Sequence, residues 1–309
     1  MDSIDQVTLN FSEANLFYLN LSLGFIMFGV AINLRLEDFV RVLKNPRAAL
    51  AGMLSQFILL PALTFLLVIL LQPKPSFALG MMLVAACPGG NISNFMSAMA
   101  KGNAALSVSL TAVSSSLSVI LTPLNLALWA SLYAPTSAIL QEVELEFWQL
   151  LKTITVLLLI PIALGMLLRR YRSRLADRLH PIMHYSSIGI FALIVLLAFK
   201  SNFDLFLEYI HLVIFLVLIH NTLALLTGYQ VGRFFKLPDA DKRAIAIETG
   251  IQNSGLGLIL IFGFFDGLGG MAIVAAWWGI WHIISGLSLA FFWNRNQELA
   301  FSKISKNNR

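Results

Sequence analysis

The most regular feature of the chain is a series of long apolar runs separated by short polar connections. Nine such runs can be marked, at about residues 15–34, 47–71, 76–99, 104–132, 147–168, 182–199, 207–232, 243–265 and 270–294. Each is close to the ~20 residues that an α-helix needs to cross a bilayer. The pattern predicts an all-α polytopic membrane protein with nine transmembrane helices, in which residues 1–309 form a single transmembrane unit.

Composition supports a membrane protein. Hydrophobic residues occupy 58% of the 309 positions and charged residues only 12%, compared with about 25% charged residues in soluble domains.

The single cysteine, Cys87, excludes an internal disulfide and a cysteine-based metal site. The five histidines are not spaced as a zinc site, and neither His-Glu-x-x-His nor Gly-x-Ser-x-Gly occurs, so the sequence does not indicate an enzyme.

The positive charges predict how the helices are oriented. All 21 lysines and arginines except Lys74, Lys152 and Lys200 fall in alternate connections or in the C-terminal tail. By the positive-inside rule, the N-terminus lies outside and the C-terminus lies in the cytoplasm, in a multi-pass protein of the inner or plasma membrane. The net charge of +5 follows from this orientation, and no nucleic-acid partner is expected. The cluster from Arg169 to Arg178 could attract anionic lipid headgroups, although orientation alone also explains it.

The chain also contains a weak internal repeat. An offset of 165 residues places Gln56 on Asn221 and Pro88-Gly89-Gly90 on Asn253-Ser254-Gly255. The same offset pairs the first four apolar runs with the last four, and a shift by five helices reverses membrane orientation. We therefore expect inverted repeats at about residues 15–132 and 182–294, an arrangement that many secondary transporters use.

Two runs in corresponding positions of the repeats carry helix-breaking residues. Pro88, Gly89 and Gly90 interrupt the third run, while Gly250 and Gly255 flank a polar triplet in the eighth. Proline removes a backbone donor, and glycine lowers the cost of leaving helical geometry. An ordinary kink would explain one such break. Two breaks in register, each beside amides and hydroxyls, point instead to a transporter site.

Glu248 is the only acidic residue deep within an apolar run. An ionised carboxylate at that depth costs roughly 2.5–3.5 kcal/mol even on a lenient scale, so it persists mainly where it faces a cavity or binds a cation. Hard cations select oxygen ligands, and unwound backbone exposes carbonyl groups. The predicted ligands are Glu248, Gln252, Ser93, Asn94, Ser107, Thr111, Gln56 and the carbonyls of Thr249 and Ile251.

Each of these residues also has a simpler explanation. Ser107 and Thr111 lie at i and i+4 on one helix face, and their hydroxyls could bond to carbonyls of their own helix. Gln56 could form an ordinary hydrogen bond between helices. Their convergence on two breaks and one acid favours the cation site.

Three separated stretches resemble the bile acid:sodium symporter (BASS) family. They are Cys87-Pro88-Gly89-Gly90-Asn91-Ile92-Ser93-Asn94, Lys101-Gly102-Asn103-Ala104-Ala105-Leu106-Ser107 and Glu248-Thr249-Gly250-Ile251-Gln252-Asn253. The resemblance covers nearly the whole chain. It implies a core domain, from about 47–132 and 207–294, and a panel domain, from about 15–34 and 147–199. In the core, two broken helices would cross at mid-membrane.

The resemblance also implies two sodium sites that share Glu248. One would use Ser93, Asn94, Ser107 and Thr111 with that carboxylate. The other would add Gln56, Gln252 and the carbonyls of Thr249 and Ile251. The coupling ions are therefore expected to be two Na⁺.

The family's organic anion binds beside the crossing point, which implicates Asn91, Asn253 and His282. Many members carry Thr where this chain has Asn91. A lone histidine among aromatic residues, such as His282, is also commonly a hydrogen-bonding residue between helices rather than a ligand contact.

The expected function is sodium-coupled symport of an organic anion, either bile-acid-like or a small 2-oxo or hydroxy carboxylate, by alternating access. Its expected partners are that anion, Na⁺ and the lipid bilayer, and no oligomer is required. Two alternatives remain open: a proton-coupled organic anion transporter, in which Glu248 titrates, and a non-transporting membrane receptor.

Overall fold

The computed structural model describes residues 4–5, 21–22, 24–29, 31–32, 34–142, 152, 155–201 and 203–307. In these ranges the chain is helical apart from short connections and one isolated bridge between Gly89 and Gln252. The elements in chain order are α2 (Leu36–Lys44), α3 (Pro46–Leu54), η1 (Ser55–Leu59), α4 (Leu60–Leu71), α5 (Pro75–Ala86), α6 (Ile92–Met99), α7 (Ala104–Ser131), α8 (Ala134–Glu142), η2 (Thr155–Leu159), α10 (Ile160–Tyr171), α11 (Ser173–Ser201), α12 (Phe203–Phe234), α13 (Asp239–Gly250), α14 (Ser254–Phe264) and α15 (Gly269–Asn307).

Several helices are suited to a bilayer. Four continuous segments of the described chain are long and apolar enough to span one: Pro46–Leu71, Ala104–Ser131, Phe206–Phe234 and Gly269–Arg295. Two shorter apolar helices, Pro75–Ala86 and Ser254–Phe264, are halves of the interrupted runs. The polytopic all-α class is thus supported. The full set of nine crossings stays a prediction, since the runs at 15–34 and 147–168 lie partly outside the described residues.

Both interruptions occur where the sequence predicts them. The third run divides into α5, which ends at Ala86, and α6, which begins at Ile92. Cys87 adopts an extended conformation with ψ of 155°, because the residue before a proline is disfavoured in helical geometry. The eighth run divides after Gly250, where Ile251 is also extended.

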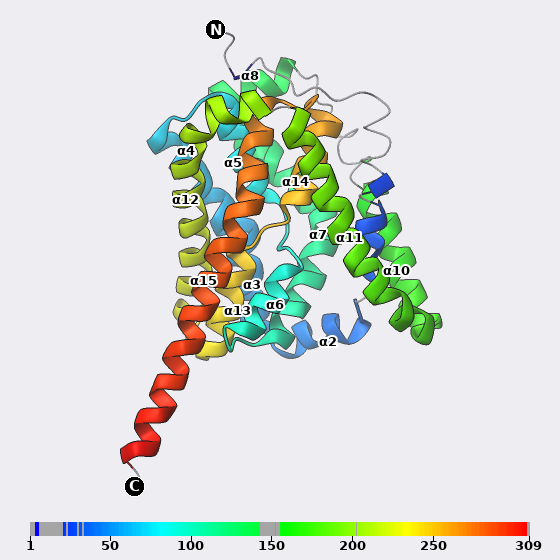
Figure 1. The fold of residues 1–309 in the computed structure, drawn as a ribbon, viewed down its shortest axis with the longest axis vertical. Helices are drawn as coiled ribbons and strands as arrows, with labels where there is room; N and C mark the ends of the chain where they lie inside the picture. The colour runs from blue at the N-terminus through cyan, green and yellow to red at the C-terminus, as the bar shows by residue number, and fades with distance from the viewer. Residues whose placement is uncertain are drawn as a thin grey trace.

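The two interruptions pair with each other. The Gly90 N–H donates to the Ile251 carbonyl at 2.7 Å, and the Asn253 N–H donates to the Pro88 carbonyl at 2.9 Å. Buried backbone groups need partners, and here each break supplies partners for the other. Figure 1 shows the result: α5 and α14 lie on one side of the breaks, and α6 and α13 lie on the other.

Two π-helical segments have a shared cause. η1 is followed by Pro61 and η2 by Pro161, each at the second position of the next helix. A proline ring clashes with the carbonyl four residues earlier, and the wider π turn relieves that clash. η1 carries Gln56, which is buried.

The helices surround a core centred on α5, α14 and α15, whose buried side chains include Leu79, Phe262 and Trp278. α12 packs along α13, and α15 packs against α5 and α12. In Figure 1, α10 and α11 lie at one edge of the molecule and α12 lies at the opposite edge.

Some boundaries differ from the sequence expectation. α2 and α8 fall in stretches predicted as connections; α2 is stabilised by Glu37 and Asp38 in its first turn and by Arg41 and Lys44 in its last. α11 begins at Ser173, whereas the apolar run predicts a start near 182. The helix extends further because Pro181 lies inside it and does not end it. α15 continues to Asn307, well past 294, since the tail lacks proline and glycine.

We predict that Gly228→Ala destabilises the protein while Gly263→Ala does not. A β-carbon at Gly228 would lie 2.6 Å from the Ala246 Cα and from the Ile245 carbonyl oxygen, so α12 and α13 would have to separate. Overpacking of this kind costs about 1–3 kcal/mol. At Gly263 no atom lies within 4 Å of the added carbon. Thermal unfolding in detergent measures both, and equal melting temperatures would contradict the close α12–α13 contact.

Candidate functional site

Glu248 lies near the end of α13 and is 3% exposed. Three hydroxyls donate to its carboxylate. Ser93 of α6 donates at 2.5 Å and Ser107 of α7 at 3.1 Å, both to Oε2, while Thr111 of α7 donates to Oε1 at 2.7 Å. A buried carboxylate is costly unless it is hydrogen-bonded, and this cluster supplies the bonds from two other helices.

Asn94 joins the same cluster. Its Oδ1 accepts from the Ser107 hydroxyl at 2.9 Å and from the Thr111 hydroxyl at 3.1 Å. Thr111 also bonds back to the Ser107 carbonyl at 3.0 Å, as the simpler explanation proposed. The hydroxyl has one proton, so the Ser107 carbonyl competes for it with Glu248 and Asn94.

Gly89 allows the first break to approach the carboxylate. A β-carbon at this position would overlap the Glu248 carboxyl group. Only glycine leaves room for the acid between the two breaks, which explains in steric terms why a glycine occupies the centre of the first interruption.

A second polar cluster is formed by Gln56 and Gln252, both about 1% exposed. The Gln56 Nε2 donates to the Gln252 Oε1 at 2.9 Å and to the Cys87 carbonyl at 2.8 Å. The Gln252 Nε2 donates to the Thr249 carbonyl at 2.6 Å. These bonds connect η1 to both breaks.

The backbone segment from Glu248 to Gln252 connects the two clusters. Glu248 precedes Thr249, whose carbonyl receives the Gln252 amide and whose hydroxyl lies 2.9 Å from the Ser55 hydroxyl. The Ile251 carbonyl accepts from the Gly90 N–H. A carbonyl oxygen has two lone pairs, so this bond leaves one for another partner.

Asn221 is a residue whose role sequence analysis missed. Its Nδ2 donates to the Gly250 carbonyl at 2.7 Å, and its Oδ1 accepts from the Ser285 hydroxyl at 2.6 Å. It therefore supports the last carbonyl of α13, as Gln56 supports the Cys87 carbonyl after α5. The alignment of Gln56 with Asn221 at the repeat offset was the available signal.

The three residues expected to contact the anion differ in how exposed they are. Asn91 and Asn253 are the N-cap residues of α6 and α14, the half-helices that follow the two breaks. Asn91 is exposed and Asn253 is half-buried. His282 of α15 is 5% exposed, and its Nδ1 has no hydrogen-bond partner among the described residues.

The donor set fits a hard monovalent cation. Around Glu248 it consists of one carboxylate, three hydroxyls and one amide oxygen, all oxygen atoms and only one of them charged. A hydroxyl that donates to a carboxylate can turn a lone pair toward a cation instead. Within the described ranges, no three His, Cys, Asp or Glu residues gather as a metal site.

Comparisons with known proteins show which family the chain resembles. Residues 20–209 match the model of the Sodium Bile acid symporter family. The chain is 34% identical over 293 residues to an uncharacterized sodium-dependent transporter, YocS, of Bacillus subtilis (strain 168), covering 93% of this chain and 88% of that protein.

Plant and human proteins are also similar. The chain is 33% identical over 270 residues to a probable sodium/metabolite cotransporter, chloroplastic BASS1 of Arabidopsis thaliana, and covers 65% of it with 87% of its own length. It is 31% identical over 242 residues to sodium/bile acid cotransporter 4 of Homo sapiens, covering 53% of that protein with 76% of its own length.

We predict that Asn221→Leu lowers stability by about 1–3 kcal/mol, because the Gly250 carbonyl and the Ser285 hydroxyl lose a buried partner. The neighbouring Thr222→Val is the control, since the Thr222 hydroxyl is exposed and bonds only to the Leu218 carbonyl of its own helix. Chemical denaturation in detergent measures both variants. Equal stability of the two would contradict the support that Asn221 gives to the second break.

Proposed function

The chain belongs to the Sodium Bile acid symporter family, and on that premise we propose that it is a sodium-coupled symporter of an organic anion that works by alternating access. The observation that carries the proposal is the Glu248 cluster. A buried carboxylate with three hydroxyls and an amide oxygen around it lies directly beside two paired helix breaks.

In this proposal two Na⁺ bind beside Glu248. The first is held by that carboxylate with Ser93, Asn94, Ser107 and Thr111, whose oxygens already converge. The second is held by Glu248, Gln56, Gln252 and the carbonyls of Thr249 and Ile251. The hydrogen bonds between the two glutamines keep their amide oxygens near those carbonyls.

The anion is proposed to bind at the N-termini of α6 and α14. A helix N-terminus carries a partial positive charge and unpaired N–H groups, which favour a carboxylate or sulfonate. The Asn253 Oδ1 accepts from the Leu256 N–H at 3.0 Å, which directs its amide donors away from the helix. Asn91 offers a second amide, and His282 is proposed as a third contact.

Sodium would couple to transport through the breaks. It would neutralise Glu248 and hold the hydroxyls of α6 and α7 against α13, so that the anion site forms only when the breaks are in order. With two Na⁺ and a monovalent anion, each cycle would move one net positive charge. A membrane potential would then add about 2.3 kcal/mol of driving force per 100 mV.

We further propose the division of the chain into two moving parts. A core from about 47–132 and 207–294 contains both breaks, and a panel from about 15–34 and 147–199 contains α10 and α11. In support, α5, α6, α7, α13 and α15 pack on one another in the part of the chain that the structure describes. The N-terminus is proposed to be outside and the C-terminus cytoplasmic.

The identity of the anion is proposed only as a class. The relatives include proteins named as sodium/metabolite and sodium/bile acid cotransporters. Small 2-oxo and hydroxy carboxylates and conjugated bile acids are therefore the first candidates. Among the described residues, no arginine lies beside the two breaks, so amides and helix termini would have to recognise the negative charge.

We predict that sodium, but not choline, stabilises the purified protein against thermal unfolding. A ligand specific for the folded state adds about 2.7 kcal/mol at a hundredfold excess over Kd. Glu248→Gln and Thr111→Val should reduce this stabilisation. Ser109→Ala should not, because the Ser109 hydroxyl, buried in the same helix, bonds only to the Ala105 carbonyl. Equal stabilisation by choline would argue against the sodium site.

Transport itself is tested in proteoliposomes loaded with a low sodium concentration. We predict that an inward sodium gradient drives accumulation of an organic anion from the candidate classes, and that an inside-negative potential increases the rate. Accumulation driven by a proton gradient without sodium would support the proton-coupled alternative. Sodium-dependent binding without accumulation would support a receptor.

A further inference from the structure

A cavity of about 430 Å³ lies between the start of α2 and the turn that joins α10 to α11. This volume falls within the range of sites for small molecules. Its lining includes Arg35, the N-cap residue of α2, and Glu37 of that helix, with Met166 and Arg169 from α10 and Asp177 from α11. Glu248 and its partners do not line this cavity, whose lining includes part of the arginine cluster of residues 169–178.

Arg169 and Asp177 form the fixed wall of the cavity. The Arg169 guanidinium donates to the Asp177 carboxylate and, through Nε, to the Ile32 carbonyl. The hydrogen bond from Arg169 lowers the pKa of Asp177 below its usual value, which keeps this carboxylate ionised. The two charges cancel, so this pair contributes little net charge to the cavity but leaves guanidinium N–H groups directed at it.

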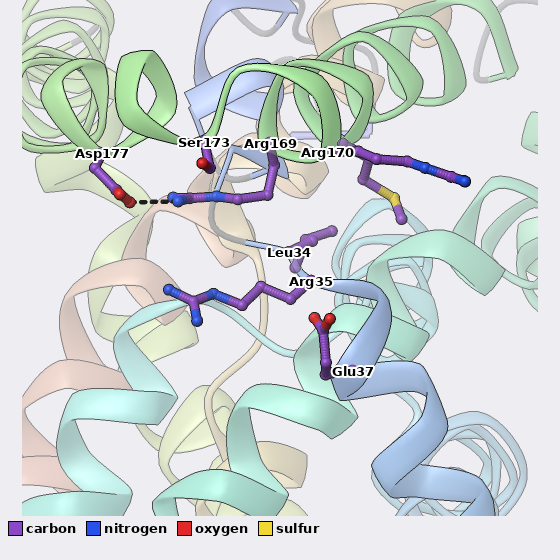
Figure 2. Close-up of a pocket in the computed structure, with 8 residues that line it drawn as sticks. Leu34, Arg35, Glu37, Arg169, Arg170, Ser173 and Asp177 are labelled. Atoms are coloured by element: carbon purple, nitrogen blue, oxygen red, sulfur yellow. Dashed lines mark hydrogen bonds and ion pairs between the residues drawn. The ribbon is translucent and has the colours of Figure 1, made fainter.

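Arg35 and Glu37 form the opposite wall. Among the described residues, neither side chain lies within an ion-pair distance of an opposite charge. The positive charge of Arg35 acts on Asp177 across the cavity and adds to the lowering of the Asp177 pKa. Figure 2 shows the Arg35 guanidinium facing Arg169 and Asp177 across the cavity, with the Glu37 carboxylate beside the start of Arg35. The wall thus carries one positive and one negative side chain whose charged groups lie at separate places along the cavity.

The surface next to the cavity is suited to lipid chains. Ile160, Leu164, Leu167 and Tyr171 follow the spacing of one helix face on α10, and their exposures are 51%, 54%, 49% and 70%. Tyr171 ends this apolar stripe beside Arg170, whose guanidinium carbon lies 5.7 Å from the ring centre. Tyrosine is enriched at the headgroup level of membranes, so the cavity lies where the headgroup of a lipid on this stripe would be.

We propose that this cavity binds the zwitterionic phosphoethanolamine headgroup of a membrane phospholipid. The phosphate would lie between Arg35 and Arg169, because guanidinium groups recognise phosphate through paired N–H donors. The ammonium would donate to Glu37. The acyl chains would lie along Leu164 and Leu167. A choline headgroup satisfies the charges but has no N–H donor for Glu37, and a glycerol headgroup has no positive charge.

Lipid binding to the full-length protein in detergent is measured by native mass spectrometry, with phosphatidylethanolamine, phosphatidylcholine and phosphatidylglycerol of identical acyl chains. We expect the wild type to bind the ethanolamine lipid most tightly. Arg35→Gln should weaken this binding about tenfold, as expected for loss of a charge-assisted phosphate contact. Glu37→Gln should remove the preference for ethanolamine over choline.

Arg174→Gln is the matched control. Arg174 belongs to the same arginine cluster and is exposed, but it does not line the cavity. An equal loss in Arg35→Gln and Arg174→Gln would overturn the proposal and indicate attraction by overall charge. Equal binding of the three lipids by the wild type would also overturn it.

A final arm separates a lipid from a soluble ligand. Soluble O-phosphoethanolamine carries the same headgroup without acyl chains, and we expect it to bind at least about tenfold more weakly than the lipid, because the apolar contacts with α10 are lost. Equal binding would assign the cavity to a soluble zwitterion instead.

Discussion

The burial of one carboxylate constrains much of this fold. Glu248 cannot remain ionised inside an apolar bundle without donors or a cation. Its requirement is met by hydroxyls from α6 and α7, which must therefore lie against α13. Gly89 has to be small enough to admit the carboxyl group. One acid thus fixes the relative positions of helices that lie more than a hundred residues apart in sequence.

The paired breaks solve a related problem for the backbone. Extended segments within a bundle leave N–H and carbonyl groups without helical partners. Here the two segments bond to each other, while Gln56 and Asn221 bond to the carbonyls at their edges. The polar groups that would make an isolated break costly become the contacts that hold the two halves together. If the proposed function holds, transport and stability depend on the same few atoms.

Sequence reasoning located the breaks and the acid because both depend on local chemistry. Pro88 and its glycines interrupt a helix wherever they stand, and a glutamate in an apolar run needs a partner in any fold. The repeat offset marked the position of Asn221, but its partner could not be predicted, because it depends on which carbonyl a distant helix presents. α2 was missed for another reason: nine residues with mixed polarity resemble a connection until their capping acids and bases are considered. The cavity beside α2 could not be predicted either, because one of its walls is formed at the start of that helix.

The mutual pairing of the breaks also bears on how the protein is made. As the first half emerges from the ribosome, the Gly90 N–H and the Pro88 carbonyl have no partner until Ile251 and Asn253 have been synthesised. About 160 residues separate these groups, and at synthesis rates of ~5–20 residues per second the wait lasts on the order of ten seconds or more. During that interval the first half has to remain open, with water or the insertion machinery satisfying its backbone. The first half therefore enters the membrane with unpaired backbone groups, which find their partners only when the second half has been made.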